Sequence, residues 1–155
     1  MKYFKKIAIL LVLITIVILT FNFFYFNMNN TSNEHDTAIF EANIIKLSKN
    51  HSIISLNEIT PFEWEKVYFF PPYTPKSEIF KSIGFRCGGI FETYNEGMMQ
   101  IVFTNKNKVV CNISGYNSKF YIHSSKNLLS KDNPKFIVTK SGENNSIISL
   151  ILDDI

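Results

Sequence analysis

The chain of 155 residues has 16 basic and 13 acidic side chains, which gives a formal net charge of +3. Lys2, Lys5 and Lys6 account for this excess at the N-terminus, and the rest of the chain is neutral. Its lysines are scattered among acidic residues, so the composition argues against nucleic-acid binding, which needs a basic patch or stripe. The roughly 120 residues that follow the N-terminal apolar run are enough for one domain with a modest core.

Residues 7–26 form an almost continuous apolar run, interrupted only by two threonines and one asparagine. At a rise of about 1.5 Å per residue, some twenty helical residues cross a hydrocarbon core about 30 Å thick. We therefore predict a transmembrane helix. The lysines before the run, with none again until Lys46, predict a cytoplasmic N-terminus and an extracytoplasmic domain.

A secretory signal peptide, removed after export, is the alternative interpretation of the same run. Its apolar part is normally about 7–15 residues long and ends at small residues suited to cleavage. Here the run is longer and ends in bulky aromatic side chains: Phe21, Phe23, Phe24, Tyr25 and Phe26. Aromatic rings favour the membrane–water interface. We therefore favour an uncleaved anchor over residues 1–26, which keeps the protein in the cell membrane.

The stretch after the anchor is polar and rich in asparagine, and residues 27–36 are predicted to form a linker. Helical spacing of apolar residues then predicts a helix over residues 37–47. Asp36 is suited to cap its N-terminus, since a carboxylate accepts hydrogen bonds from the free amides of a first turn. Asn50 and His51 are expected to end it.

Residues 52–59 mix alternation with a short apolar run and predict an edge strand. Residues 65–70 predict a better strand, stopped by two prolines that have no amide to donate to a sheet. The clearest local signal follows. Thr74 is suited to the N-cap of a helix, Pro75 to its first position and Gly84 to the left-handed position after its end, so a two-turn helix is predicted.

From Phe85 onwards the pattern changes to strands separated by turn residues. Residues 86–93, 98–104 and 108–114 predict an antiparallel meander. Further strands are predicted at residues 119–123, 135–140 and 146–152. Helices first and strands later predict an α+β domain over residues 37–155, with two helices packed on one face of a mostly antiparallel β-sheet.

Cys87 and Cys111 are the only cysteines, and in an oxidising compartment they invite a disulfide. In the predicted meander they lie on strands separated by a third strand, about 9.5 Å apart. A disulfide needs Cα atoms within about 7 Å. Cys87 therefore lies in a loop before its strand, or both thiols are free. A membrane-anchored thiol enzyme, with Cys87 or Cys111 as nucleophile and His123 as base, is the sharpest catalytic hypothesis.

No other pattern predicts chemistry. The three histidines, His35, His51 and His123, are far apart and do not match the ligand spacing of a zinc site. The sequence has no phosphate-binding glycine loop and no nucleophile or metalloprotease motif. We therefore predict no catalytic residue, no cofactor and no metal.

Residues 62–75 have an unusual density of aromatic side chains. Alternation along the predicted strand places Trp64 and Tyr68 on one side and Val67 and Phe69 on the other. The strand is then either covered on both faces by the core or offers one face to a partner. If a partner binds, the residues expected to contact it are Trp64, Tyr68 and Tyr73, because Trp and Tyr dominate binding hot spots.

The run Trp-Glu-Lys-Val-Tyr-Phe-Phe-Pro-Pro-Tyr-Thr and the short helix that follows, residues 64–84, resemble small membrane-anchored or lipoprotein-like proteins of Gram-positive bacteria. The resemblance covers about twenty-five residues and carries no activity, so it implies no site. The cysteine that lipidated members carry after the apolar run is absent here.

The sequence thus predicts a single-pass membrane protein whose extracytoplasmic domain is a protein-interaction module at the bacterial envelope. Two alternatives stay open: the anchored thiol enzyme, and a module that binds a small ligand or senses stress.

Overall fold

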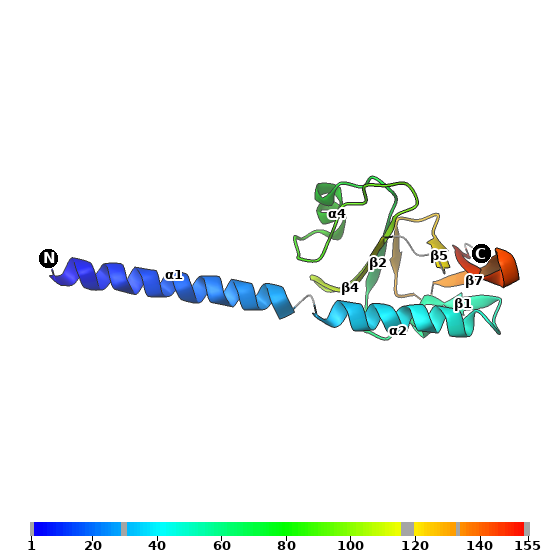
Figure 1. Cartoon of the computed structure of the whole chain (residues 1–155), viewed down its shortest axis with the longest axis horizontal. Helices are drawn as coiled ribbons and strands as arrows, with labels where there is room; N and C mark the ends of the chain where they lie inside the picture. The colour runs from blue at the N-terminus through cyan, green and yellow to red at the C-terminus, as the bar shows by residue number, and fades with distance from the viewer. Residues whose placement is uncertain (1, 29–30, 116–119, 133, 154–155) are drawn as a thin grey trace.

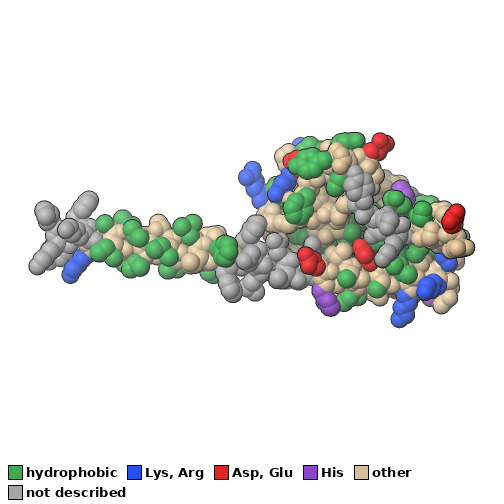
Figure 2. All heavy atoms as spheres, in the orientation of Figure 1, with side chains coloured by type: hydrophobic (Ala, Val, Ile, Leu, Met, Phe, Trp, Pro, Cys, Tyr) green, Lys and Arg blue, Asp and Glu red, His purple; other side chains and the backbone are tan. Residues whose placement is uncertain are grey.

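The computed structural model describes residues 2–28, 31–115, 120–132 and 134–153. A long helix, α1 (Lys2–Met28), projects from a body formed by the rest of the chain (Figure 1). Residues 6–23 of α1 form one segment apolar and long enough to cross a membrane, with a mean hydropathy of 2.5 and no part of it buried. Figure 2 shows hydrophobic side chains along this helix, whereas charged side chains lie mostly over the body.

The second helix, α2 (Thr31–Leu47), begins earlier than the sequence predicts. Most of the expected linker over residues 27–36 is therefore helical, although residues 29–30 lie outside the described part. Asp36 lies inside α2 and cannot be its N-cap. Glu34 in the first turn suits the positive end of the helix dipole, which helps to explain the early start. The end is as predicted, because the amides of Asn50 and His51 both donate to the carbonyl of Leu47.

The strands form two four-stranded sheets rather than the single sheet expected. One has the order β1 (Ile53–Ser55), β7 (Lys135–Ser141), β8 (Ile147–Leu152) and β5 (Phe120–His123). The other has the order β4 (Lys108–Gly115), β3 (Met99–Asn105), β2 (Lys66–Phe70) and β6 (Leu128–Ser130). Only the β5–β8 pair is parallel among the described pairs. The α+β class and the mostly antiparallel pairing are confirmed.

Two predicted strands differ from the structure. The strand predicted at residues 86–93 is irregular backbone, where Gly89 has a φ of 74° that interrupts extended structure. Residues 52–59 form only the short edge strand β1 and then a single helical turn, α3 (Leu56–Ile59). A capping box stabilises that turn, because the Ser55 and Glu58 side chains bond each other's backbone amides.

The two sheets share one core. It includes Val67 and Phe69 of β2, Phe136 of β7 and Leu150 of β8, with Phe40 of α2 packed against them. Phe103 of β3 lies in edge-to-face contact with three other aromatic rings, at centroid distances of 5.1–5.6 Å: Phe40, Phe62 and Trp64. Such pairs stabilise a core by about 0.5–1.5 kcal/mol each beyond their buried area.

A second, smaller core covers the outer face of the β4-β3-β2-β6 sheet. Here α4 (Lys76–Ile83) and the segment after it pack on Tyr68, Phe70 and Val102. Since α2 packs on the first core and α4 on the second, the prediction that both helices lie on one face is wrong. In the other sheet Ile53, Ile137 and Ile151 are neighbours in register and are exposed, so no element of the described part of the chain covers them in the same way.

Candidate functional site

The aromatic strand is covered on both faces, as one of the two interpretations of residues 62–75 required. Val67 and Phe69 point into the shared core, whereas Tyr68 and Phe70 point into the smaller one. Tyr68 is 7% exposed, and its ring stacks on that of Phe70 at a centroid distance of 6.2 Å. Tyr68 therefore has little surface to offer a partner.

Trp64 lies before β2 rather than on it, and it belongs to the shared core at 1% exposure. The expectation that it shares a side with Tyr68 is therefore wrong. Tyr73, in contrast, is 64% exposed. Of the three aromatic residues predicted to contact a partner, Tyr73 is the one with a free surface in this fold, and its role stays a prediction.

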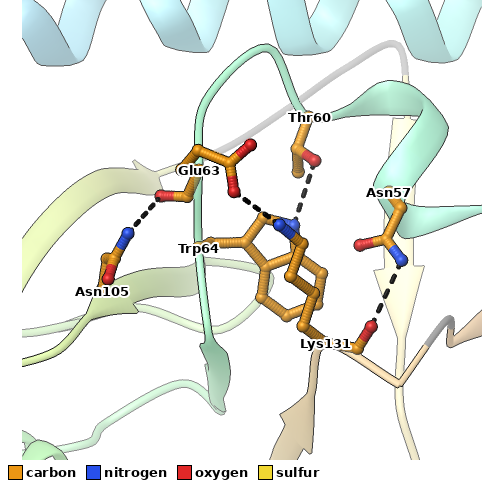
Figure 3. A network of polar contacts seen from close by, with 6 residues as sticks. All are labelled: Asn57, Thr60, Glu63, Trp64, Asn105 and Lys131. Carbon is orange, nitrogen blue, oxygen red and sulfur yellow. Dashed lines mark hydrogen bonds and ion pairs between the residues drawn. The ribbon is translucent and has the colours of Figure 1, made fainter.

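Trp64 is held by a polar network that joins loop residues to both neighbouring strands. Figure 3 shows its members: Asn57, Thr60, Glu63, Trp64, Asn105 and Lys131. Trp64 Nε1 donates to Thr60 Oγ1 at 3.1 Å, and Lys131 Nζ lies 2.6 Å from Glu63 Oε2. Asn105 Nδ2 donates to the Glu63 carbonyl at 3.4 Å. These contacts fasten the loop onto the sheet, and their role is structural.

Two further exposed aromatic side chains lie in the segment after α4. Phe91 is 65% exposed and Tyr94 is 68% exposed. This segment is tied to the one that carries Tyr73, because Thr93 Oγ1 accepts from the Thr74 amide at 3.0 Å. We call Tyr73, Phe91 and Tyr94 the aromatic rim. Neither Phe91 nor Tyr94 was predicted as a contact residue, because residues 86–93 were assigned to a strand of the meander and Tyr94 to the turn after it.

A carboxylate from the same segment stabilises the start of α4. Glu92 Oε1 accepts a hydrogen bond from the Lys76 amide at 3.2 Å, where the sequence predicts a cap by Thr74. Thr74 instead donates its hydroxyl to the Pro71 carbonyl at 2.7 Å. Tyr94 shares the Glu92 carboxylate, which raises the pKa of its phenol. Hydrogen bonds to Thr93 and Glu92 thus tie the segment that carries Phe91 and Tyr94 to the segment that leads from Tyr73 into α4.

The two cysteines are free and belong to different cores. Cys111 is fully buried on β4, where its Sγ lies 3.6 Å from Thr37 Oγ1, and burial raises its pKa to about 11. Cys87 is half-buried beside α4, and its pKa is raised by burial, partly opposed by the charge of Lys76. Because the two cores lie on opposite faces of one sheet, this structure contains no bridge between the thiols.

The structure does not place His123 as the base that the thiol-enzyme hypothesis requires. It is exposed on β5, in the sheet that does not contain Cys111, and its ring stacks on Tyr121 at 6.4 Å. A raised pKa disfavours the thiolate that nucleophilic catalysis needs. Within the described residues, no three His, Cys, Asp or Glu side chains gather closely enough to hold a metal ion.

A pocket of about 370 Å³ lies where the last turn of α2 meets the β7–β8 hairpin. Its lining comes from both elements: Ile45, Ser48, Lys49, Lys140, Asn144, Ser146 and Ile148. No sequence pattern indicates a shared site here, since the two groups of residues lie about ninety residues apart along the chain.

Comparison with known proteins provides no functional assignment. No family model, no curated protein and no solved structure matches this chain. Any functional conclusion therefore depends on the geometry of the chain itself.

Proposed function

We propose that the protein is anchored in the cell membrane by α1, with its N-terminus in the cytoplasm and its α+β domain outside. The observation that carries this proposal is the exposure of the apolar helix: residues 6–23 have a mean hydropathy of 2.5 and are not buried by the domain. Burying one large aliphatic side chain is worth about 1.5–3 kcal/mol, so many exposed together strongly favour transfer to lipid.

The polar side chains inside α1 are compatible with lipid. Thr15 Oγ1 donates to the Val12 carbonyl at 2.8 Å, and Thr20 Oγ1 donates to the Val17 carbonyl at 3.0 Å. Asn22 Nδ2 likewise bonds a carbonyl one turn earlier, at 2.7 Å. Hydrogen bonds made within the helix lower the cost of placing polar groups in hydrocarbon, where water is absent. This supports a spanning role for the whole run.

The anchor is tested by the intact mass of the protein extracted from its native membrane. A spanning anchor predicts the full-length mass. A mass that lacks about the first thirty residues would show a cleaved signal instead.

Orientation needs a separate labelling experiment on intact cells. A membrane-impermeant maleimide should modify a cysteine placed at the exposed Ser82 of α4 but not one placed at Lys2, with peptide mass spectrometry to locate the label. Labelling at Lys2 alone would reverse the proposed topology.

The domain is proposed to act as a protein-interaction module, with the aromatic rim as its contact surface. Three exposed aromatic rings on two hydrogen-bonded segments resemble the hot-spot composition of protein interfaces. A photo-crosslinking amino acid in place of Tyr94 should give a discrete adduct on intact cells. The matched control is the same amino acid at Asn107, an exposed position in the β3–β4 turn. Identical adducts at both positions would contradict the rim as the contact surface.

A further inference from the structure

The pocket between α2 and the β7–β8 hairpin has the dimensions and chemistry of a small-ligand site. Its volume of about 370 Å³ lies within the range of about 300–1,000 Å³ common for such sites. It is formed where two elements far apart in the sequence meet. The side chains that line it determine which class of ligand it can bind.

Two lysines line this pocket. Lys49 follows the end of α2, and Lys140 lies near the end of β7, and both side chains are exposed. No carboxylate is among the described lining residues, and Glu143, the acidic residue of the adjoining turn, does not line the pocket. The negative end of the α2 dipole favours a cation at Lys49, but it does not account for the second cation, Lys140. The described pocket lining thus carries two ammonium groups and no carboxylate, a balance of charge that favours an anionic ligand.

The turn that closes the pocket has a specialised backbone. Gly142 has a φ of 77°, and a Cβ atom at this position would lie 2.9 Å from Ser146 Oγ. Asn144 also has a left-handed backbone, with φ 55° and ψ 30°. The absence of a side chain at Gly142 therefore allows the turn to hold Ser146 against the pocket. Ser146 and Asn144 add a hydroxyl and an amide, both neutral hydrogen-bonding groups, to the lining.

The remaining lining is apolar or already bonded. Ile148 is 7% exposed and Ile45 is partly buried, so both belong to the edge of the shared core. Ser48 is buried, and its hydroxyl donates to the Ile45 carbonyl at 3.1 Å. The lining therefore combines two cationic side chains with the apolar surface of Ile45 and Ile148.

We propose that this pocket binds a small organic anion. Its carboxylate or phosphate group lies between Lys49 and Lys140, and its apolar portion rests on Ile45 and Ile148. Charge-assisted hydrogen bonds from ammonium groups supply most of the recognition, because they are roughly twice as strong as neutral ones. The proposal does not depend on the membrane topology or on a partner at the aromatic rim.

The test uses the full chain in nanodiscs of zwitterionic lipid and ligand-observed saturation-transfer NMR, with empty nanodiscs as the reference. The probes are hexanoate, hexyl phosphate and hexyltrimethylammonium, which share an apolar chain and differ in the charged group. We expect saturation transfer to at least one of the two anions and none to the cation. The anion that binds more tightly identifies the head group as carboxylate or phosphate.

Variants assign the binding to this pocket. Lys49→Gln with Lys140→Gln should weaken anion binding at least tenfold, whereas Lys49→Arg with Lys140→Arg should retain it. Lys46→Gln, an exposed lysine of the same helix that does not line the pocket, should leave binding unchanged. If the glutamine variant does not fold, as judged by circular dichroism, loss of binding in a folded Ile148→Asp variant takes its place.

Three results would overturn the proposal. The first is that neither anion binds the protein. The second is that the cation binds as tightly as the anions, which would make the site merely apolar. The third is that the folded glutamine or aspartate variant binds the anions as well as the native chain does.

Discussion

Asn112 of β4 donates a hydrogen bond from Nδ2 to the carbonyl of Gly89 at 2.7 Å. Its Oδ1 accepts a second bond from Gln100 Nε2 of the neighbouring strand β3 at 3.2 Å. Gln100 is fully buried, and its own Oε1 has no partner among the described groups. Asn112 therefore links the sheet to the irregular segment that covers the smaller core.

Replacing Asn112 by Leu keeps the side-chain size and removes both bonds. An unpaired buried polar group costs about 1–3 kcal/mol, so we expect the free energy of unfolding in urea to fall by about 2 kcal/mol. Amide hydrogen exchange should become faster over residues 88–98. Ser114→Ala, on an exposed position of the same strand, should change stability by less than about 0.5 kcal/mol. Equal effects of the two substitutions would contradict this role for Asn112.

Alanine substitutions of the aromatic residues near β2 should lower the free energy of unfolding much more for a core residue than for a surface residue. Trp64→Ala removes a fully buried indole and its contact with Phe103, at a centroid distance of 5.5 Å. Such truncations cost about 3–5 kcal/mol. Tyr73→Ala removes an exposed ring and should cost less than about 0.5 kcal/mol. Urea unfolding of both variants measures the contrast, and a small cost at Trp64 would argue against its burial.

The cysteines should differ in reactivity towards iodoacetamide. Burial raises the pKa of Cys111 to about 11, so almost no thiolate forms there at pH 8. The pKa of Cys87 is also raised, but its side chain is half-exposed and should react first. In denaturant both should react at similar rates without a reducing agent. Alkylation that requires prior reduction would reveal a disulfide, and rapid reaction of native Cys111 would revive the thiol-enzyme hypothesis.

The Glu63–Lys131 pair should make the fold less stable at acidic pH. Lys131 lowers the pKa of the Glu63 carboxyl from its ordinary value of 4.5 by a hydrogen bond and by its charge. A carboxyl with a lowered folded-state pKa stabilises the fold above its unfolded pKa, and this stabilisation is lost as the pH falls through the folded value. Glu63→Gln should therefore show a smaller drop in Tm between pH 7 and pH 3 than the native chain.

The matched control for this pair is Lys131→Gln. It should reduce the pH dependence in the same way, and the double variant should add nothing further. A native pH dependence in either single variant would mean that the exposed pair contributes nothing, as many surface ion pairs do.

Local signals in the sequence predicted local structure well. Helix α4 was predicted because Gly84 supplies the left-handed residue that ends it, and its φ is 88°. Its N-terminal cap could not be predicted, because Glu92 reaches it from a segment sixteen residues away. The strand β6 was also missed, since its three residues form a strand only by pairing with β2.

The larger arrangement depends on long-range contacts that alternation does not specify. Period-two patterns predicted most strands but could not tell that they divide into two sheets. For the same reason the burial of Trp64 and Tyr68 was left open, because an aromatic strand covered on both faces has the same pattern as one that offers a face to a partner. The α2–hairpin pocket joins Lys49 to Lys140, so no sequence motif could indicate it.

The short interval between α1 and α2 limits how far the domain can travel. Only two residues separate Met28 from Thr31, and two extended residues cover at most about 7 Å. Through Phe40 and Ile44, the second half of α2 is itself part of the core, so this half cannot detach to lengthen the tether. If α1 spans the bilayer as proposed, the domain stays next to the lipid head groups. Its partners would then have to come to the membrane surface, because this protein cannot reach out to them.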